Sequence, residues 1–291
     1  MLQSLFGAAF FLSPGSRLMA AAEVPRRIVA LDLPATDIAV FAGADLVGAA
    51  VASQYRSGRS DFVLDDIVAD IGTTAEPNLE LLYSLAPDLL VSAWPIPVPR
   101  VLSEIAPILN LQVFQAGLDR FQLFADAVAK VAANVSTVAP AGQSVADANN
   151  RLDVLARRLE PVSHGPVILA NLNGDGIHLR ALGPHSMCGA ITVRLNVKNA
   201  FTGNDGIWGW RLMRPEELLA SPDAWLIEVL QHWDGPALAR RRLIDSPIWQ
   251  QLPQVRSNRW VTLPPVALLG GLCSGMRFAS SFAAALEERT R

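Results

Sequence analysis

Short apolar runs alternate with segments of helical periodicity along most of the chain, and this pattern predicts an α/β protein. RIVALD, which ends at Asp32, and DLVGAAVA, which begins at Asp45, are expected strands on either side of a helix over 36–42. LQVFQ, at 111–115, is an expected closing strand for this first group. In the second half of the chain the expected strands are PVILANL, GIHLRAL, DAWLIEVL and RWVTLP.

The segment 70–94 carries strong helix and strand signals. Thr73 and Glu76 have the spacing of a capping box, and proline suits a first helical turn, so we expect a helix over 77–85. The apolar run 89–91 follows, as in a strand that is buried on both faces of a parallel sheet.

Much of this pattern recurs over 214–230. Pro215 opens a short expected helix, Pro222 ends it, and an apolar strand follows Asp223. The recurrence indicates that the chain is built from two similar lobes.

Apolar residues at intervals of three and four over 118–135 predict one amphipathic helix. At ~1.5 Å per residue it is about 27 Å long, enough to join two lobes as a rigid strut. A helix over 144–159 is expected to begin the second lobe, and a helix over 271–288 to end it. The expected domains are an N-terminal lobe at 23–117, an interlobe helix at 118–136 and a C-terminal lobe at 137–291.

Two loops lie where ligands bind in open α/β sheets, at the ends of the strands. The first, 53–66, is polar and irregular and brings Tyr55, Arg56 and Arg59 close together. The second, WPIPVPR at 94–100, contains three prolines that fix its backbone and lower the entropy cost of holding a ligand.

Composition narrows the choice of partners. Half of the 291 residues are apolar, so a sizeable core is expected. A formal charge of −3 with scattered arginines argues against nucleic acid as a partner. The two cysteines, Cys188 and Cys273, are too few for a disulfide framework, although they can pair if the fold brings them together.

The N-terminus resembles a secretory signal over 1–22. The apolar run 5–12 is too short to span a bilayer, and the alanines at 20–22 fit an A-x-A cleavage rule that starts the mature chain near Glu23. No Lys or Arg precedes Arg17, so the alternatives are a start codon placed too late or a frayed N-terminal helix.

The catalytic and metal-binding motifs in this sequence are incomplete. GLCSG at 271–275 matches a nucleophile elbow with Cys273 as nucleophile, but such an elbow needs a histidine later in the chain, and all four histidines come earlier. The histidines also lack the paired spacing of zinc ligands, so no metal held by the protein is expected. A hydrolase acting through Cys273 is therefore the least favoured alternative.

Aromatic residues in loops are better candidates for binding. NDGIWGW places Trp208 and Trp210 among three glycines, and Trp94 opens the proline-rich loop. Such loops often present aromatic surface to a ligand, so we expect these three tryptophans to contact one.

The sequence resembles a known family in six segments: RIVALD, EPNLELL, LGPHSM, IWGW, SPIWQQLPQVRSNRW and GMRF. From about residue 26 to the C-terminus the chain is similar to the periplasmic ferric-hydroxamate siderophore-binding proteins of the ferrichrome type. The resemblance implies two α/β lobes joined by a single long helix, with a ligand cleft between them. It also implies a transport role without catalysis or a cofactor, because the iron arrives already chelated by the siderophore.

The resemblance further implies the partners and some of the residues that meet them. Trp208 matches a pocket tryptophan of the family. Glu80 and Glu216, with Glu217 as the reserve, match acidic residues that dock onto arginines of an inner-membrane ABC permease with its ATPase. The protein itself would be a monomer in the periplasm, and an outer-membrane receptor would act before it in uptake.

This chain also departs from the family pattern. Thr74 stands where ferrichrome binders carry an arginine that binds the hydroxamate oxygens. The family's pocket tyrosine falls in the WPIP loop, which here contains Trp94 but no tyrosine. We therefore expect Arg56 and Arg59 to replace that arginine, as suits a carboxylate-bearing siderophore. Exposed loop arginines without a ligand are the alternative for these two residues, and haem or a corrinoid is the alternative ligand.

Overall fold

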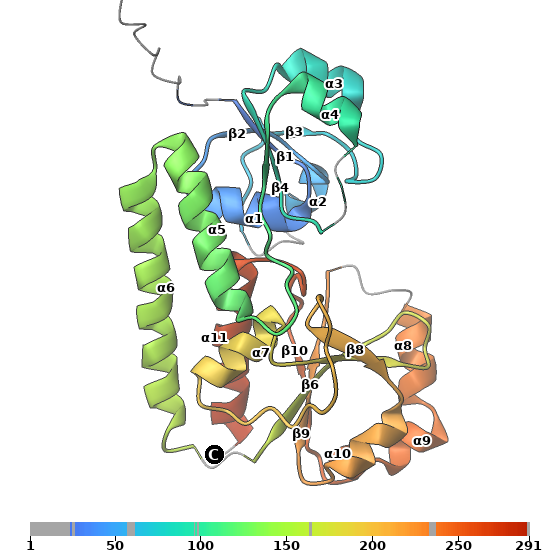
Figure 1. Ribbon diagram of the computed structural model, residues 1–291. Coiled ribbons are helices and arrows are strands. Elements are labelled where there is room, and N and C mark those ends of the chain that lie inside the picture. Colours follow the sequence, from blue (N-terminus) through green and yellow to red (C-terminus); the bar gives the residue numbers. More distant parts are fainter. Residues whose placement is uncertain are drawn as a thin grey trace, which may run out of the picture.

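Two α/β lobes stand one above the other in the computed structural model, which describes residues 24, 27–56, 62–95, 97, 99–162, 165–232 and 237–289 (Figure 1). The expected signal at 1–22 lies outside these ranges. The first lobe is built on a parallel sheet in the order β3-β2-β1-β4-β5. Its elements are β1 (Ile28–Ala30), α1 (Leu33–Phe41), β2 (Leu46–Ala49), α2 (Ala52–Arg56), β3 (Ala69–Asp70), α3 (Leu79–Leu85), β4 (Leu89–Ser92), α4 (Arg100–Ile105) and β5 (Ile108–Asn110).

The central strands of this sheet are buried on both faces, as their continuous apolar runs predict. Ala30 and Val91 face the large core that also contains α1, whereas Val29 and Leu90 face a smaller core under α3 and α4. Because the strands are parallel, their carboxyl ends, which lead into the loops of the site, lie at one edge of the sheet.

The second lobe contains a mixed sheet in the order β10-β9-β6-β7-β8, in which β6, β9 and β10 are parallel and β7 and β8 antiparallel. Its elements are β6 (Val167–Leu172), β7 (Leu179–Leu182), α7 (Met187–Arg194), β8 (Trp210–Met213), the 3₁₀ helix η1 (Pro215–Ala220), β9 (Trp225–Val229), α8 (Ala237–Ile244), α9 (Pro247–Gln251), α10 (Pro253–Arg256), β10 (Trp260–Leu263) and α11 (Leu272–Arg289). The expected strands and the C-terminal helix are confirmed, and β8 is an additional strand.

Two helices, α5 (Arg120–Val135) and α6 (Val138–Leu159), run side by side along both lobes (Figure 1). Where they meet, Thr137 Oγ1 donates to the carbonyl of Ala42 in the first lobe at 2.6 Å. At the far end of α6, Arg158 pairs with Glu287 of α11 at 2.7 Å. The long connection from the first lobe to the second is thus α6, about 33 Å at ~1.5 Å per residue. The domain division at 117 and 137 stays a prediction, since α5 packs against α1 of the first lobe and also against α7 and α11 of the second.

Three local expectations are corrected. The helix expected from residue 144 begins at Val138, because a proline at position 140 is tolerated within a first helical turn. The closing strand expected at 111–115 is β5 at Ile108–Asn110, and only Leu111 continues the pairing, through its N–H to the Ser92 carbonyl. Thr73 does accept a bond from the Glu76 N–H at 3.1 Å, but this closes a turn, and the helix that follows is capped by Asn78.

Candidate functional site

Three aromatic side chains from different parts of the chain meet between the lobes, and we call Trp94, Phe114 and Trp208 the aromatic junction. Trp94 follows β4 in the first lobe, Phe114 lies on the segment that leaves that lobe, and Trp208 precedes β8 in the second. Ring centroids lie 5.3 Å apart for Trp94 and Trp208, 5.2 Å for Phe114 and Trp208 and 6.0 Å for Trp94 and Phe114. These are favourable distances for aromatic pairs, so the junction links the two lobes directly.

Trp94 borders two hollows in the first lobe, with volumes of 450 and 490 Å³. Such volumes suit small-molecule sites, and the first hollow lies at the carboxyl ends of the parallel strands. The described lining of the first is Leu31, Val51, Thr73, Thr74, Ala75, Ser92, Trp94, Pro97, Pro99 and Leu102. That of the second is Ala93, Trp94, Pro95, Pro97, Asn110, Leu111, Gln112, Phe114 and Gln115. Neither described lining includes a charged side chain.

A buried carboxylate, Asp32, holds Trp94 in place. One oxygen of Asp32 accepts from the Ala35 N–H and caps α1. The other accepts from Ser92 Oγ at 2.8 Å, from the Ala93 N–H at 2.9 Å and from the Trp94 N–H at 3.1 Å. Burial raises the pKa of Asp32 even though these hydrogen bonds oppose the shift. The position of Trp94 therefore depends on a side chain 62 residues earlier.

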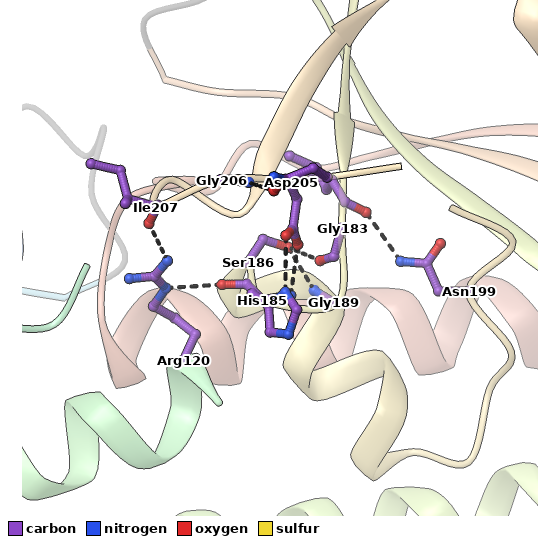
Figure 2. A network of polar contacts seen from close by, with 11 residues as sticks. Arg120, Gly183, His185, Ser186, Gly189, Asn199, Asp205, Gly206 and Ile207 are labelled. Atoms are coloured by element: carbon purple, nitrogen blue, oxygen red, sulfur yellow. Dashed lines mark hydrogen bonds and ion pairs between the residues drawn. The ribbon is translucent and has the colours of Figure 1, made fainter. Parts of the chain in front are cut away.

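A buried arginine in the first turn of α5, Arg120, reaches the loops of the second lobe that carry His185 and Ile207 (Figure 2). Its guanidinium donates to the carbonyls of Val113, His185 and Ile207. It also lies 4.8 Å from the centroid of the Phe114 ring. Burial lowers the pKa of Arg120 to about 10, so the group remains a cation at neutral pH.

The loop that carries Trp208 is fixed against the start of α7 (Figure 2). Asp205, which is buried, accepts the His185 N–H and contacts His185 Nδ1, both at 2.9 Å. Gly209 follows Trp208 at a φ of 75°, and a Cβ there would lie 2.4 Å from the Ser186 nitrogen. Only glycine fits this close approach, which explains the spacing of IWGW.

A second buried carboxylate, Asp37, connects α1 of the first lobe to the N-terminus of α11. It accepts from the N–H groups of Cys273 and Ser274 at 3.2 and 3.3 Å and from Ser274 Oγ at 3.2 Å. Complete burial raises the pKa of Asp37 to about 6, against the effect of these bonds.

The raised pKa of Asp37 predicts a pH-dependent stability. Between pH 4 and 6 the folded state binds the proton that the unfolded state has released, so stability falls as pH rises through this window. One unit of pKa is worth about 1.4 kcal/mol, so the shift corresponds to roughly 3 kcal/mol. Urea unfolding should therefore show that the stability of wild type relative to Asp37→Asn declines from pH 4 to pH 6 and is constant above pH 7. Asp153→Asn, at an exposed site, is the control, and a pH-independent difference for Asp37→Asn would contradict the argument.

The structure does not place Tyr55 and Arg56 in the expected first ligand loop. Both lie in α2, and Tyr55 is 3% exposed and stacked on Phe62 at 4.9 Å, so the prediction of a loop at these two residues is wrong. Arg56 donates to the carbonyls of Asp66 and Val68 at 3.0 and 2.8 Å, which fixes the loop. Arg59 lies outside the described residues.

The other expected residues are placed as follows. Thr74 is exposed and lines the first hollow together with Trp94. Trp210 begins β8 and is not a loop residue. Glu80 and Glu216 are exposed, and neither forms an ion pair within the described part of the chain. Asp32, Phe114 and Arg120 were missed, because each acts through contacts distant in sequence.

The two cysteines are not joined to each other. No disulfide links Cys188 and Cys273, so the pairing left open above does not form, and Cys273 lies in the first turn of α11. Within the described ranges no three His, Cys, Asp or Glu side chains are grouped so as to hold a metal ion. No described helix has the length and apolar character needed to cross a membrane.

Comparisons with known proteins agree on a family. The model of the family described as "Periplasmic binding protein" matches residues 28–267. The chain is 29% identical over 260 residues to the iron(3+)-hydroxamate-binding protein FhuD of Escherichia coli K12, covering 89% of this chain and 86% of that one. It is 24% identical to the Fe(3+) dicitrate-binding periplasmic protein FecB of the same organism, covering 83% and 80%. The solved structure of Vibrio cholerae FhuD with Fe³⁺–Desferal superposes with a TM-score of 0.82 at 22% identity, covering 91% of this chain and 99% of that one.

Proposed function

The chain belongs to the periplasmic binding protein family, and from this premise we propose that it captures a ferric siderophore and delivers it to an ATP-driven permease of the inner membrane. The observation that carries the proposal is the aromatic junction: Trp94 of the first lobe lines two hollows of ligand size and lies 5.3 Å from Trp208 of the second lobe. The hydroxamate- and dicitrate-binding relatives support an iron chelate as the ligand class.

Binding in this proposal combines stacking with hydrogen bonds. Trp94 and Trp208 would separate slightly to hold the organic shell of the chelate, and Trp210 would support it from β8. The hydroxyls of Thr73 and Thr74 and the apolar wall around them suit the outer atoms of a chelate, whose iron needs no ligand from the protein. The protein itself performs no chemistry on its cargo and acts in the periplasm.

Fluorescence titration tests the proposed function. Wild type should show tryptophan quenching that saturates at micromolar concentration with at least one member of a panel of ferric hydroxamate, citrate and catecholate chelates. Trp208→Ala should weaken that binding by about tenfold or more, because stacking on an aromatic ring is worth roughly 1–1.5 kcal/mol beyond the apolar area that is also lost. Trp225→Phe, at the start of β9, is the matched control and should bind as wild type does.

Haem and cobalamin belong in the same panel, since they are the alternative ligands for this scaffold. Saturable quenching by either of these two, with none by any ferric siderophore, would refute the proposal while keeping the family.

A further inference from the structure

The side chain of Arg180, on β7 (Leu179–Leu182), forms no ion pair with any residue that the structure describes. Its guanidinium carbon lies 5.4 Å from the centroid of the Trp210 ring. Its Nε is buried and makes no hydrogen bond within the described part of the chain, although the residue as a whole is partly exposed. Leaving a charged donor buried without an acceptor costs free energy, so this arrangement is unusual for a side chain with only a structural role.

Among the described residues, the neighbours of Arg180 do not neutralise its charge. Leu182, two residues along the same strand, faces the large core, so Arg180 points to that face of the sheet as well. The buried Glu228 lies on the other face and is already paired with Arg240 through two bonds of 2.7 Å. Opposite Arg180 on β6 is Asn171, which is neutral and bonded to the Val229 carbonyl and to Gln231.

Arg180 also lies next to the site. Trp210, over whose ring the guanidinium of Arg180 lies, follows Trp208 of the aromatic junction by two residues. The described linings of both hollows in the first lobe are uncharged, and Arg56 already donates to two backbone carbonyls. The guanidinium of Arg180 is therefore a positive charge of the second lobe that lies close to the aromatic junction.

We propose that Arg180, whose guanidinium lies over the ring of Trp210, binds an anionic group of the chelate, a carboxylate above all, and so favours negatively charged cargo. A guanidinium presents two parallel N–H donors that match the two oxygens of a carboxylate. The ring of Trp210 fixes the plane of the guanidinium before the ligand arrives, which reduces the entropy lost on binding. This inference rests on the proposed function and assigns to Arg180 the role that the sequence suggested for Arg56 and Arg59.

Two probes that differ in charge test the proposal: ferric dicitrate, which carries carboxylates, and Fe³⁺–Desferal, which carries a free amine and no carboxylate. Arg180→Gln should weaken binding of ferric dicitrate by roughly 10- to 100-fold, as expected for loss of a charge-assisted hydrogen bond, and change the affinity for Fe³⁺–Desferal by less than about threefold. Arg180→Lys should recover part of the loss, because it restores the charge without the fork. The affinity of wild type for ferric dicitrate should also fall with added salt more steeply than that of Arg180→Gln.

Arg289→Gln is the matched control, since Arg289 is stacked on Trp225 at 5.9 Å at the far end of the second lobe and should be neutral for both probes. An equal loss of affinity for both probes in Arg180→Gln, an unchanged affinity for ferric dicitrate, or binding of Fe³⁺–Desferal alone by wild type would each overturn this inference and leave the proposed function standing. Failure of wild type to bind any ferric chelate would overturn the proposed function and the inference together.

Discussion

Replacing Glu80 and Glu216 together by alanine is expected to abolish uptake of the ferric chelate and to leave its affinity for the protein unchanged. The two glutamates occupy the same position in equivalent elements: each is the second helical residue, Glu80 after the cap Asn78 in α3 and Glu216 after Arg214 in η1. Both are exposed, and neither is engaged in an ion pair within the described residues. A permease that presents arginines to both lobes would lose both attachment points in the double variant.

Glu216 and Glu217, the two candidates for docking in the second lobe, differ in their contacts. The carboxylate of Glu217 pairs with Arg211 at 2.9 Å and accepts the Arg214 N–H at 2.9 Å, and these contacts lower its pKa. Glu217 therefore stabilises η1 and is not free for a partner. The first assignment, Glu216, is the one we retain as a proposal.

Uptake of the chelate labelled with radioactive iron, in cells that depend on this protein, measures the effect. The matched control is Glu76→Ala with Asp245→Ala, which removes one exposed carboxylate from each lobe. Each single variant, Glu80→Ala or Glu216→Ala, should retain part of the uptake, because one lobe remains attached. Normal uptake by the Glu80→Ala and Glu216→Ala double variant would rule out docking through these residues.

Local sequence patterns predicted the elements of this fold well where the pattern and the packing agree. The run 89–91 became β4 and the pattern after Pro215 became η1, because each is bounded by prolines and has a single way to bury its apolar residues. The pattern failed at LQVFQ, where alternation suggested a strand. Val113 and Phe114 are buried there, but they pack into the core and the aromatic junction after the chain has left the sheet.

The expected residues Trp94, Trp208 and Thr74 lie close to one another, since Trp94 contacts Trp208 and lines the first hollow with Thr74, whereas Phe114 was missed. Trp94 and Trp208 were identified because large aromatic residues in loops rich in glycine or proline have few structural roles. Asp32 looked like an ordinary residue at a strand end, and Arg120 lies in a helix whose periodicity predicts an exposed basic side chain. Their roles come from partners 60 or more residues away, such as Ser92 for Asp32 and His185 for Arg120, and no local pattern contains that information.

Arg120→Ala should lower the free energy of unfolding by roughly 3–5 kcal/mol, a large effect for one substitution. Three carbonyls, of Val113, His185 and Ile207, would lose their donor in a buried place, and each unsatisfied group costs about 1–3 kcal/mol. Part of this cost would be recovered if water enters the space left by the side chain, which is why the sum of the three is an upper limit.

Urea unfolding of wild type, Arg120→Ala and Arg120→Lys measures this effect. Lysine keeps the charge and can reach one of the carbonyls, so Arg120→Lys should lie between the other two proteins. Arg151→Ala, which removes an exposed arginine that donates to Ser280 Oγ, is the control and should change stability by less than about 0.5 kcal/mol. An Arg120→Ala protein within 1 kcal/mol of wild type would show that Arg120 does not hold the lobes together. Since Arg120 also contacts Phe114 and the Trp208 loop, the variant should lose chelate affinity even below its unfolding midpoint, a loss that Arg151→Ala should not share.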